Sequence, residues 1–292
     1  MVMHTKSPTP APTPPAHTTR TLPYGAAAVA DGAAIIRAGG CVAVPTETVY
    51  GLAADATSAA GVAGIYAAKG RPDFNPLIVH VADRAMADAL GEWNDVARHL
   101  ADCFWPGPLT IVVPRAPDCP VATIATAGLD SIALRCPAHP AMQALIRAAA
   151  RPLAAPSANA SGTVSPTSAA HVLRTLAGHV PLVIDAGPCA QGLESTIVRP
   201  SADHITLLRP GPITAEDLAA RTGLPVRGDD SGTVTAPGQL ASHYAPGKPV
   251  LLDCVARVDG AFHIGFGPGP CDYSLSQSGD AVAGAAHLFD AL

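Results

Sequence analysis

Short apolar segments alternate with longer segments of helical periodicity through most of this chain, and this alternation constrains its fold more than any other feature. The predicted strands are residues 41–44, 77–81, 109–113, 131–135, 152–155, 181–185, 196–199 and 204–209. The predicted helices are residues 25–38, 59–68, 85–103, 141–149 and 168–177. Such a succession favours an α/β domain, so we predict one large, twisted mixed sheet with flanking helices over residues 22–226.

The segments on either side of this domain differ from it in composition. Residues 1–21 are rich in Pro and Thr and carry too little apolar surface to offset the entropy of ordering, which predicts a disordered tail. Residues 227–249 are polar and rich in Gly and Pro, as is typical of a linker. Residues 250–292 hold two strand-like segments, 250–255 and 262–267, and a final helix. So short a unit is marginal as an independent core, so we expect that it leans on the first domain or is cut short.

Composition narrows the class of function. The net charge of −5 argues against a broad basic face, so no stable nucleic-acid complex is expected. The seven cysteines are widely spaced and include no C-x-x-C pair, which predicts neither a zinc site nor a disulfide framework. No apolar stretch has the length of a membrane span or the form of a secretory signal. We therefore expect a cytoplasmic protein with reduced thiols.

The segment PTETVYGL sets two hydroxyls and a carboxylate at the end of the predicted strand 41–44. In an extended backbone Thr46 and Thr48 would face one side and Glu47 the other. Two hydroxyls can hold a small polar ligand, because each donates and accepts hydrogen bonds, and they can equally cap the turn and the next helix. The segment leaves both interpretations open and assigns Glu47 no catalytic role.

Cations and an imidazole stand at the ends of other predicted elements. Lys69 and Arg71 follow a helix, with Asn75 close behind, and suit either phosphate contacts or compensation of the helix dipole. His80 and Arg135 lie on predicted strands, where such side chains are more often solvated or satisfied in the core than bound to a ligand. None of these residues would be chosen as a site residue on its own.

The loop over residues 155–166 follows an apolar strand and is rich in small polar side chains. Loops of this kind at the strand ends of an α/β sheet bind phosphorylated ligands, although the same residues are ordinary turn formers. Its polar side chains include Ser157, Asn159 and Ser165. The sequence lacks G-x-S-x-G, H-E-x-x-H, a Walker lysine motif and a metal-ligand cluster, so it predicts neither a covalent nucleophile nor a protein-held metal.

Taken in order, these segments resemble the YrdC-like family, the threonylcarbamoyl-adenylate synthases. The pattern is carried by PTETVYGL, K-x-R-P-x-x-N-P-L-x-x-H, WPGPLT, TAGLDSIALRCPAHP, APSANASG, ESTIV and LLRPG. The later segments APGQLASHYAP, IGF and LSQSGD resemble the longer, two-domain form of the family. The resemblance covers residues 22–292 and implies a small, incomplete Rossmann-like α/β domain over residues 250–292.

The resemblance implies that ATP, bicarbonate and L-threonine become threonylcarbamoyl-AMP and pyrophosphate, with Mg²⁺ carried by ATP. Separate machinery would then transfer the threonylcarbamoyl group to an adenosine beside the anticodon of tRNAs that read codons beginning with A. The chain would therefore be a nucleotidyltransferase that acts in tRNA processing.

The resemblance also implies roles for individual residues. Those on the threonine side are Thr48, which is preferred over Thr46, then Thr46, His80, Arg135, Ser195 and the backbone near Ala155. Those on the ATP side are Lys69, Arg71, Asn75, Thr126, Ser157, Asn159, Ser165, Arg209, His243 and Tyr244. Lys69, Arg71 and Arg209 would stabilise charge that develops on the phosphates, and the linker with His243 and Tyr244 would close over the site as a lid.

Two alternatives share the same fold. One is an RNA-binding module without nucleotide turnover, against which the acidic charge balance and the sparse aromatic residues weigh. The other is a carbamoyl-transfer maturation factor, which brings an acylphosphatase-like segment and paired C-x-x-C fingers that this sequence lacks.

Overall fold

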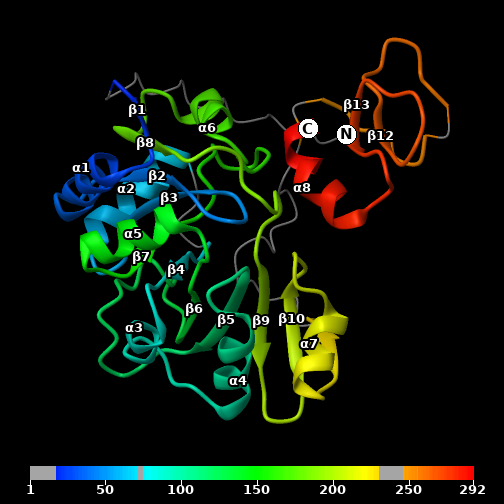
Figure 1. Ribbon diagram of the computed structural model, residues 1–292. Coiled ribbons are helices and arrows are strands. Elements are labelled where there is room, and N and C mark those ends of the chain that lie inside the picture. Colours follow the sequence, from blue (N-terminus) through cyan, green and yellow to red (C-terminus); the bar gives the residue numbers. More distant parts are fainter. Residues whose placement is uncertain (1–17, 71–74, 230–245, 247, 255) are drawn as a thin grey trace, which may run out of the picture.

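The computed structural model describes residues 18–70, 75–229, 246, 248–254 and 256–292, and its larger part is built on a mixed sheet of eleven strands (Figure 1). The strand order is β1-β8-β2-β3-β7-β4-β6-β5-β9-β10-β11. These strands are β1 (Arg20–Pro23), β2 (Val42–Pro45), β3 (Tyr50–Asp55), β4 (Ile78–His80), β5 (Leu109–Pro114), β6 (Ser131–Arg135), β7 (Leu153–Ala154), β8 (Leu182–Asp185), β9 (Thr196–Pro200), β10 (Ile205–Arg209) and β11 (Val226–Gly228).

Helices flank the sheet along its length (Figure 1). They are α1 (Ala26–Arg37), α2 (Ala59–Lys69), α3 (Arg84–Asp88), α4 (Asp95–Phe104), α5 (Pro140–Ala149), α6 (Ala169–Leu176) and α7 (Ala215–Thr222). Parallel pairs such as β4 with β6 occur beside antiparallel pairs such as β2 with β3. The predicted α/β fold with a large mixed sheet is thus confirmed.

Both faces of the sheet are covered, and strand β2 shows how. Ala43 packs in one apolar cluster with Leu52, while Val42 and Val44 pack in a second cluster with Leu145 of α5. Because successive side chains point to opposite faces, a strand covered on both sides must be apolar throughout. This is why the sequence reads as an uninterrupted apolar run before Pro45, with polar side chains only beyond it.

Strand β3 was not predicted, and it determines the geometry after residue 45. It returns antiparallel to β2, so the polar segment between them is the turn of a hairpin. Its sequence YGLAAD contains no β-branched residue and lacks the usual strand signal. It is a strand because both its faces are buried and because it packs closely against the segment that follows β7, its neighbour in the sheet. A Cβ added to Gly51 would lie 3.3 Å from the Cβ of Ala155 in that segment.

The single helix predicted over residues 85–103 is wrong, because the structure has α3 and α4 with an extended break between them. Gly91 bridges to Arg115 in this break, where a side chain on residue 91 would collide with Val113. Asn94 then starts α4 by accepting a hydrogen bond from the N–H of Ala97. Strands β1 and β11 and helix α7 were also not predicted, and the sheet starts at Arg20 and ends at Gly228, two residues beyond the expected domain at each end.

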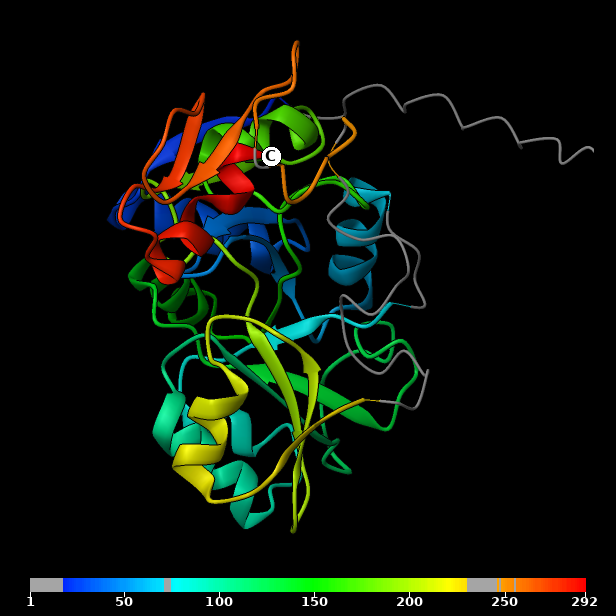
Figure 2. The same ribbon diagram turned by 90° about the vertical axis from the view of Figure 1, so that its right-hand side faces the viewer.

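The C-terminal unit contains two parallel strands, β12 (Ile264–Phe266) and β13 (Tyr273–Ser276), and helix α8 (Ala281–Ala291). The strand predicted at residues 250–255 is wrong for the described residues 250–254, where Leu251 and Leu252 are exposed and unpaired with any strand. Figures 1 and 2 place α8 beside the upper half of the sheet, near α6. Nε2 of His171 on α6 lies 3.1 Å from Oδ1 of Asp290 on α8, and a Cβ on Gly192 would lie 2.0 Å from the carbonyl oxygen of Ala286.

Among the described helices, none has the combination of length and apolarity needed to cross a bilayer.

The Leu134→Ala variant should lose about 2–5 kcal/mol of unfolding free energy, because Leu134 on the central strand β6 is 0% exposed and its truncation leaves a cavity. Urea unfolding followed by circular dichroism measures this loss. The matched Leu252→Ala variant removes a side chain that is 81% exposed and should change the free energy by less than about 0.5 kcal/mol. Equal losses in the two variants would contradict the assignment of the core.

Candidate functional site

A pocket of about 450 Å³, including its open mouth, lies where the ends of several strands converge. It is lined by Thr46, Val49, Gly51, Ile78, His80, Arg135, Ala155, Pro156, Ser157, Glu194 and Arg209. These residues come from the β2–β3 hairpin, from β4, from the ends of β6 and β10, and from the segments after β7 and before β9. Residues far apart in the sequence thus form one polar site, because strand ends are where a sheet buried on both faces can expose polar side chains.

The hydroxyl of Thr46 closes the β2–β3 hairpin turn and also lines the pocket. It donates to the carbonyl oxygen of Val49 (2.7 Å) and accepts from the backbone N–H groups of Thr48 and Val49 (both 3.2 Å). Oγ1 of Thr48 lies 2.8 Å from Oγ1 of Thr46, and Thr48 is fully buried and does not line the pocket. The hydroxyl of Thr46 therefore caps the turn. Of the two threonines, Thr46 lines the pocket, whereas Thr48, which the resemblance preferred, does not.

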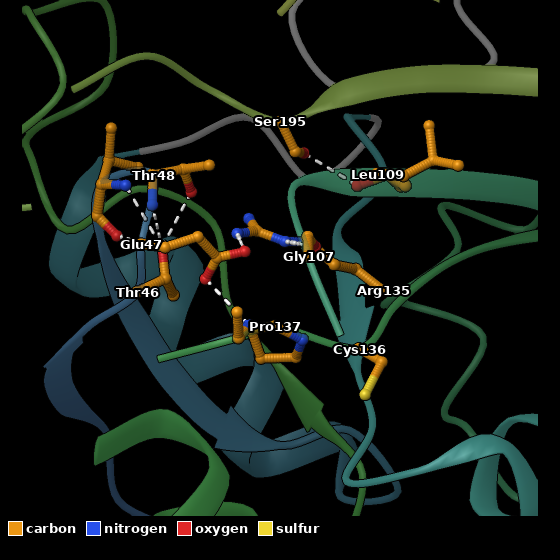
Figure 3. A network of polar contacts seen from close by, with 12 residues as sticks. Thr46, Glu47, Thr48, Gly107, Leu109, Arg135, Cys136, Pro137 and Ser195 are labelled. Carbon is orange, nitrogen blue, oxygen red and sulfur yellow. Dashed lines mark hydrogen bonds and ion pairs between the residues drawn. The ribbon is translucent and has the colours of Figure 1, made fainter. Parts of the chain in front are cut away.

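Arg135 lines the pocket and is held in a buried ion pair with Glu47, which does not line it (Figure 3). Its Nη2 donates to Oε1 of Glu47 (2.7 Å), and its Nε donates to the carbonyl oxygen of Gly107 (3.3 Å). The other carboxylate oxygen of Glu47 accepts from the N–H of Ala138 (3.1 Å). The Arg135 and Glu47 side chains are 3% and 10% exposed. The sequence assigned Glu47 no catalytic role and did not predict that it pairs with a pocket arginine.

His80 on β4 presents a neutral ring to the pocket. Burial, followed by the positive charge of Arg135, lowers the pKa of His80 from its ordinary value of 6.5 to about 3. Within the part of the chain that the structure describes, its Nδ1 is buried and has no hydrogen-bond partner. A neutral imidazole beside a guanidinium can donate at one nitrogen and accept at the other, which suits a hydroxyl or an amine on a bound ligand.

Arg209 and Glu194 form a second charged pair in the pocket wall. Oε2 of Glu194 lies 3.6 Å from Nη2 of Arg209, and Oε1 accepts from the hydroxyl of Ser165 (2.7 Å). Arg209 also donates to the carbonyl oxygen and the hydroxyl of Ser195, both at 3.0 Å. Ser195 is fully buried behind Arg209 and bonds to Oγ1 of Thr110 (2.8 Å), so it supports the pocket wall without lining it.

Lys69, at the end of α2, holds the loop that follows β7. Its ammonium donates to the carbonyl oxygens of Ser157 and Asn159 and to Oδ1 of Asn159 (3.3 Å). The amide of Asn159 in turn donates to the carbonyl oxygen of Thr163 (2.8 Å). In this structure Lys69 orders the small polar loop, and its predicted place beside phosphates stays a prediction.

The remaining predicted site residues lie outside the pocket lining or outside the described residues. Asn75 is buried, and its carbonyl oxygen accepts from the hydroxyl of Tyr66 (3.0 Å). Thr126 is buried and donates to the carbonyl oxygen of Thr123 (3.2 Å). The residues outside the described part are Arg71, His243 and Tyr244.

The structure adds pocket residues that the sequence did not single out. Glu194 is the charged residue among them. The sequence could have indicated it, because it directly precedes Ser195 in the segment GLESTIV. The others are Val49, Gly51, Ile78 and Pro156. The described residues contain no group of three or more His, Cys, Asp or Glu side chains placed to hold a metal ion.

Comparison with known proteins gives consistent matches. Residues 34–211 match the family Sua5_yciO_yrdC, described as "Telomere recombination". The chain is 44% identical over 230 residues to the threonylcarbamoyl-AMP synthase of Bacillus subtilis (strain 168), which covers 77% of this chain and 66% of that protein. It is 41% identical over 243 residues to the threonylcarbamoyl-AMP synthase of Schizosaccharomyces pombe, covering 72% of this chain and 60% of that protein.

Among solved structures, that of P. abyssi Sua5 complexed with L-threonine matches with a TM-score of 0.81 at 34% identity, over 94% of this chain and 87% of that chain. The chain spans 66% of the length of the Bacillus subtilis relative and 60% of that of the Schizosaccharomyces pombe relative.

The buried neutral His80 should make the protein less stable as the pH falls from about 6.5 towards 3. The unfolded chain binds a proton at this ring below its ordinary pKa of 6.5, whereas the folded protein does so only near 3. The contribution of the neutral His80 ring to the unfolding free energy is therefore fully present above pH 6.5. Below pH 6.5 it falls by at most about 1.4 kcal/mol per pH unit. Urea unfolding at several pH values should show a shallower slope for His80→Gln, which keeps every other titrating group. Parallel slopes would contradict the assignment.

The Lys69→Met variant should lose about 1–3 kcal/mol of unfolding free energy, because it leaves the part-buried carbonyl oxygen of Ser157 and the buried one of Asn159 without their charged donor. Thermal and urea unfolding measure the change. The matched control is Lys248→Met at an exposed position, where less than about 0.5 kcal/mol is expected. A Lys69→Met protein as stable as the control would show that the ammonium does not hold the loop.

Proposed function

This chain belongs to the Sua5_yciO_yrdC family, and from this premise we propose that it is an L-threonylcarbamoyladenylate synthase, which makes threonylcarbamoyl-AMP and pyrophosphate from ATP, bicarbonate and L-threonine. The observation that carries the proposal is the convergence of two guanidinium groups, those of Arg135 and Arg209, on one pocket with a neutral His80 between strand ends. Guanidinium groups suit carboxylates and phosphates, which are the anionic parts of the two larger substrates.

The threonine substrate would occupy the part of the pocket near Arg135. The guanidinium group would bind the substrate carboxylate, and the ring of His80, beside the turn that Thr46 caps, is a polar group for the rest of a small amino acid. The segment from Ala155 to Ser157 adds backbone groups to the same wall. Support comes from the P. abyssi Sua5 structure, which is described as complexed with L-threonine.

ATP would lie towards Arg209 and the loop that Lys69 holds. Arg209 would contact the phosphates of ATP. So would Arg71, which lies outside the described residues. We propose that Mg²⁺ enters with ATP and keeps mainly phosphate and water ligands, because no carboxylate cluster among the described residues forms a closed protein cage. Glu194 and Ser157 are the oxygen-bearing side chains at the pocket that would hold the ion, and Glu194 would then exchange a contact with Arg209 or Ser165. When bound, Mg²⁺ would screen negative charge on the phosphates.

The proposed reaction has two steps that bring negative charges together. The threonine amine attacks the carbon of bicarbonate, and water leaves, so that an N-carboxylate forms. An oxygen of this carbamate attacks the α-phosphate of ATP, and the bond to pyrophosphate breaks. Arg135 and Arg209 would lower the repulsion between the two anions and hold them in line, so the protein contributes by positioning and by electrostatic stabilisation.

The product is a mixed anhydride that water hydrolyses, so we place its use in a following transfer step to a tRNA adenosine by separate machinery. We also place the reaction in the cytoplasm. The seven cysteines, all within the described residues, form no disulfide, which supports a reducing compartment.

Pyrophosphate release from ATP by the purified chain should require both bicarbonate and L-threonine. The assay omits each in turn and follows pyrophosphate with a coupled enzyme. Release that needs neither would indicate an ATPase and contradict the proposal, and a folded protein without release would contradict it as well.

Arg135→Lys should raise the KM for L-threonine by about 10-fold or more, because a lysine keeps the charge but loses the planar pair of N–H donors. Steady-state kinetics with L-threonine and with ATP varied separately measures the effect. Arg98→Lys, at an exposed position on α4, is the matched control and should leave both KM values unchanged. An equal change in the control would remove the support for a specific contact.

A further inference from the structure

We propose that Glu47 is a positioning residue that fixes the guanidinium group of Arg135 for the carboxylate of the amino-acid substrate. This inference rests on the proposed function, which names that substrate. Glu47 lies in the turn of the β2–β3 hairpin, and Arg135 ends β6 on a different part of the sheet. Figure 3 shows the two side chains pointing toward each other, with a dashed line marking their contact.

Two of the three nitrogens of Arg135 are bound to protein oxygens. Nη2 donates to Oε1 of Glu47 at 2.7 Å, and Nε donates to the carbonyl oxygen of Gly107 at 3.3 Å. A guanidinium group is planar, so contacts at two of its nitrogens fix both its position and the orientation of its plane. Within the described residues Nη1 has no protein partner, while Arg135 lines the pocket. The Nη1 side is therefore the part of the group that is available to a ligand.

Glu47 is itself held, so it can act as a fixed support. Its Oε2 accepts from the N–H of Ala138, in the segment that leads from β6 to α5. Its own carbonyl oxygen accepts from the N–H of Gln191 at 2.9 Å, in the segment that leads to Glu194. The residue thus ties together the hairpin, the end of β6 and the segment before β9, which are three walls of the pocket.

The charge of Glu47 also decides whether Arg135 can be buried. An arginine that is 3% exposed is strongly destabilised without a counter-charge, and Glu47 is the carboxylate in contact with it. The Glu47–Arg135 pair as a whole is neutral. A ligand carboxylate would therefore meet a guanidinium group whose orientation is already fixed and which still has N–H groups that are not bonded to Glu47 or Gly107. Because Arg135 is already oriented, less side-chain conformational entropy is lost when a ligand binds. Glu47 would therefore raise the affinity for carboxylate ligands although it does not contact them.

The test compares Glu47→Gln, Glu47→Asp and the wild type in binding of L-threonine by isothermal titration calorimetry, and in KM for L-threonine and for ATP. Glu47→Gln keeps the shape but removes the charge, so the dissociation constant of L-threonine should rise about tenfold while the KM for ATP changes less than twofold. Glu47→Asp keeps the charge and should bind L-threonine more tightly than Glu47→Gln. The matched control Glu92→Gln, at an exposed position, should behave as the wild type.

Two further measurements separate positioning from general structural support. L-Threoninamide, which lacks the carboxylate, should bind the wild type and Glu47→Gln equally. In the Arg135→Ala background, Glu47→Gln should cause no further loss of affinity for L-threonine, because the side chain it positions is gone. Unchanged threonine affinity in Glu47→Gln, or a parallel rise in the KM values for threonine and ATP, would overturn the inference.

The outcomes also separate this inference from the proposed function. A wild type that binds L-threonine but releases no pyrophosphate would overturn the synthase activity, while the binding data on the variants would still decide the role of Glu47. A wild type that binds no L-threonine would overturn both.

Discussion

The burial of both faces of the sheet is the constraint from which the site follows. Along β2 the side chains alternate between two apolar clusters, and the same clusters cover the neighbouring strands. A polar side chain within such a strand would be removed from water without a partner. The buried charged side chains therefore lie at the ends of strands or beyond them, and in a mixed sheet several ends meet at one place. The pocket at the ends of β2, β6 and β10 is the result of that confinement.

Each buried charged side chain at or beside this pocket has specific polar partners. Arg135 is paired with Glu47, Arg209 with Glu194, and Lys69 with loop carbonyl oxygens. Burial of an ion pair gains little net stability, since desolvation of both groups opposes their attraction. These pairs are therefore better understood as devices that orient donors than as sources of stability. His80 meets the same constraint by remaining uncharged.

The sequence predicted the fold well where one physical effect dominated. Apolar strands such as those beginning at Leu109 and Ser131 were placed correctly, because burial on two faces leaves a continuous apolar run. It failed where a tertiary contact overrode local preference. Strand β3 consists of small residues that only their packing makes a strand, and the helix expected across Gly91 is broken by a close contact with β5.

The candidate site was predicted in outline but not in its internal connections. Thr46, His80, Arg135, Ser157 and Arg209 line one pocket, as a set of polar residues at strand ends should. The pairing of Glu47 with Arg135 joins residues that are 88 positions apart in the sequence, so no local pattern could reveal it. The same holds for Lys69, whose contacts with the loop at Asn159 depend on how α2 and β7 are packed.

The contact between Gly192 and the backbone of Ala286 has a consequence for how this chain can vary. The glycine belongs to the segment that ends in Glu194 at the pocket wall, and α8 lies directly against it. Any side chain at position 192 would push the C-terminal helix away or displace the pocket wall. The C-terminal unit and the pocket wall thus meet at a contact that has no room for a side chain. If either part were replaced by that of a relative, the other part would have to match it at this contact.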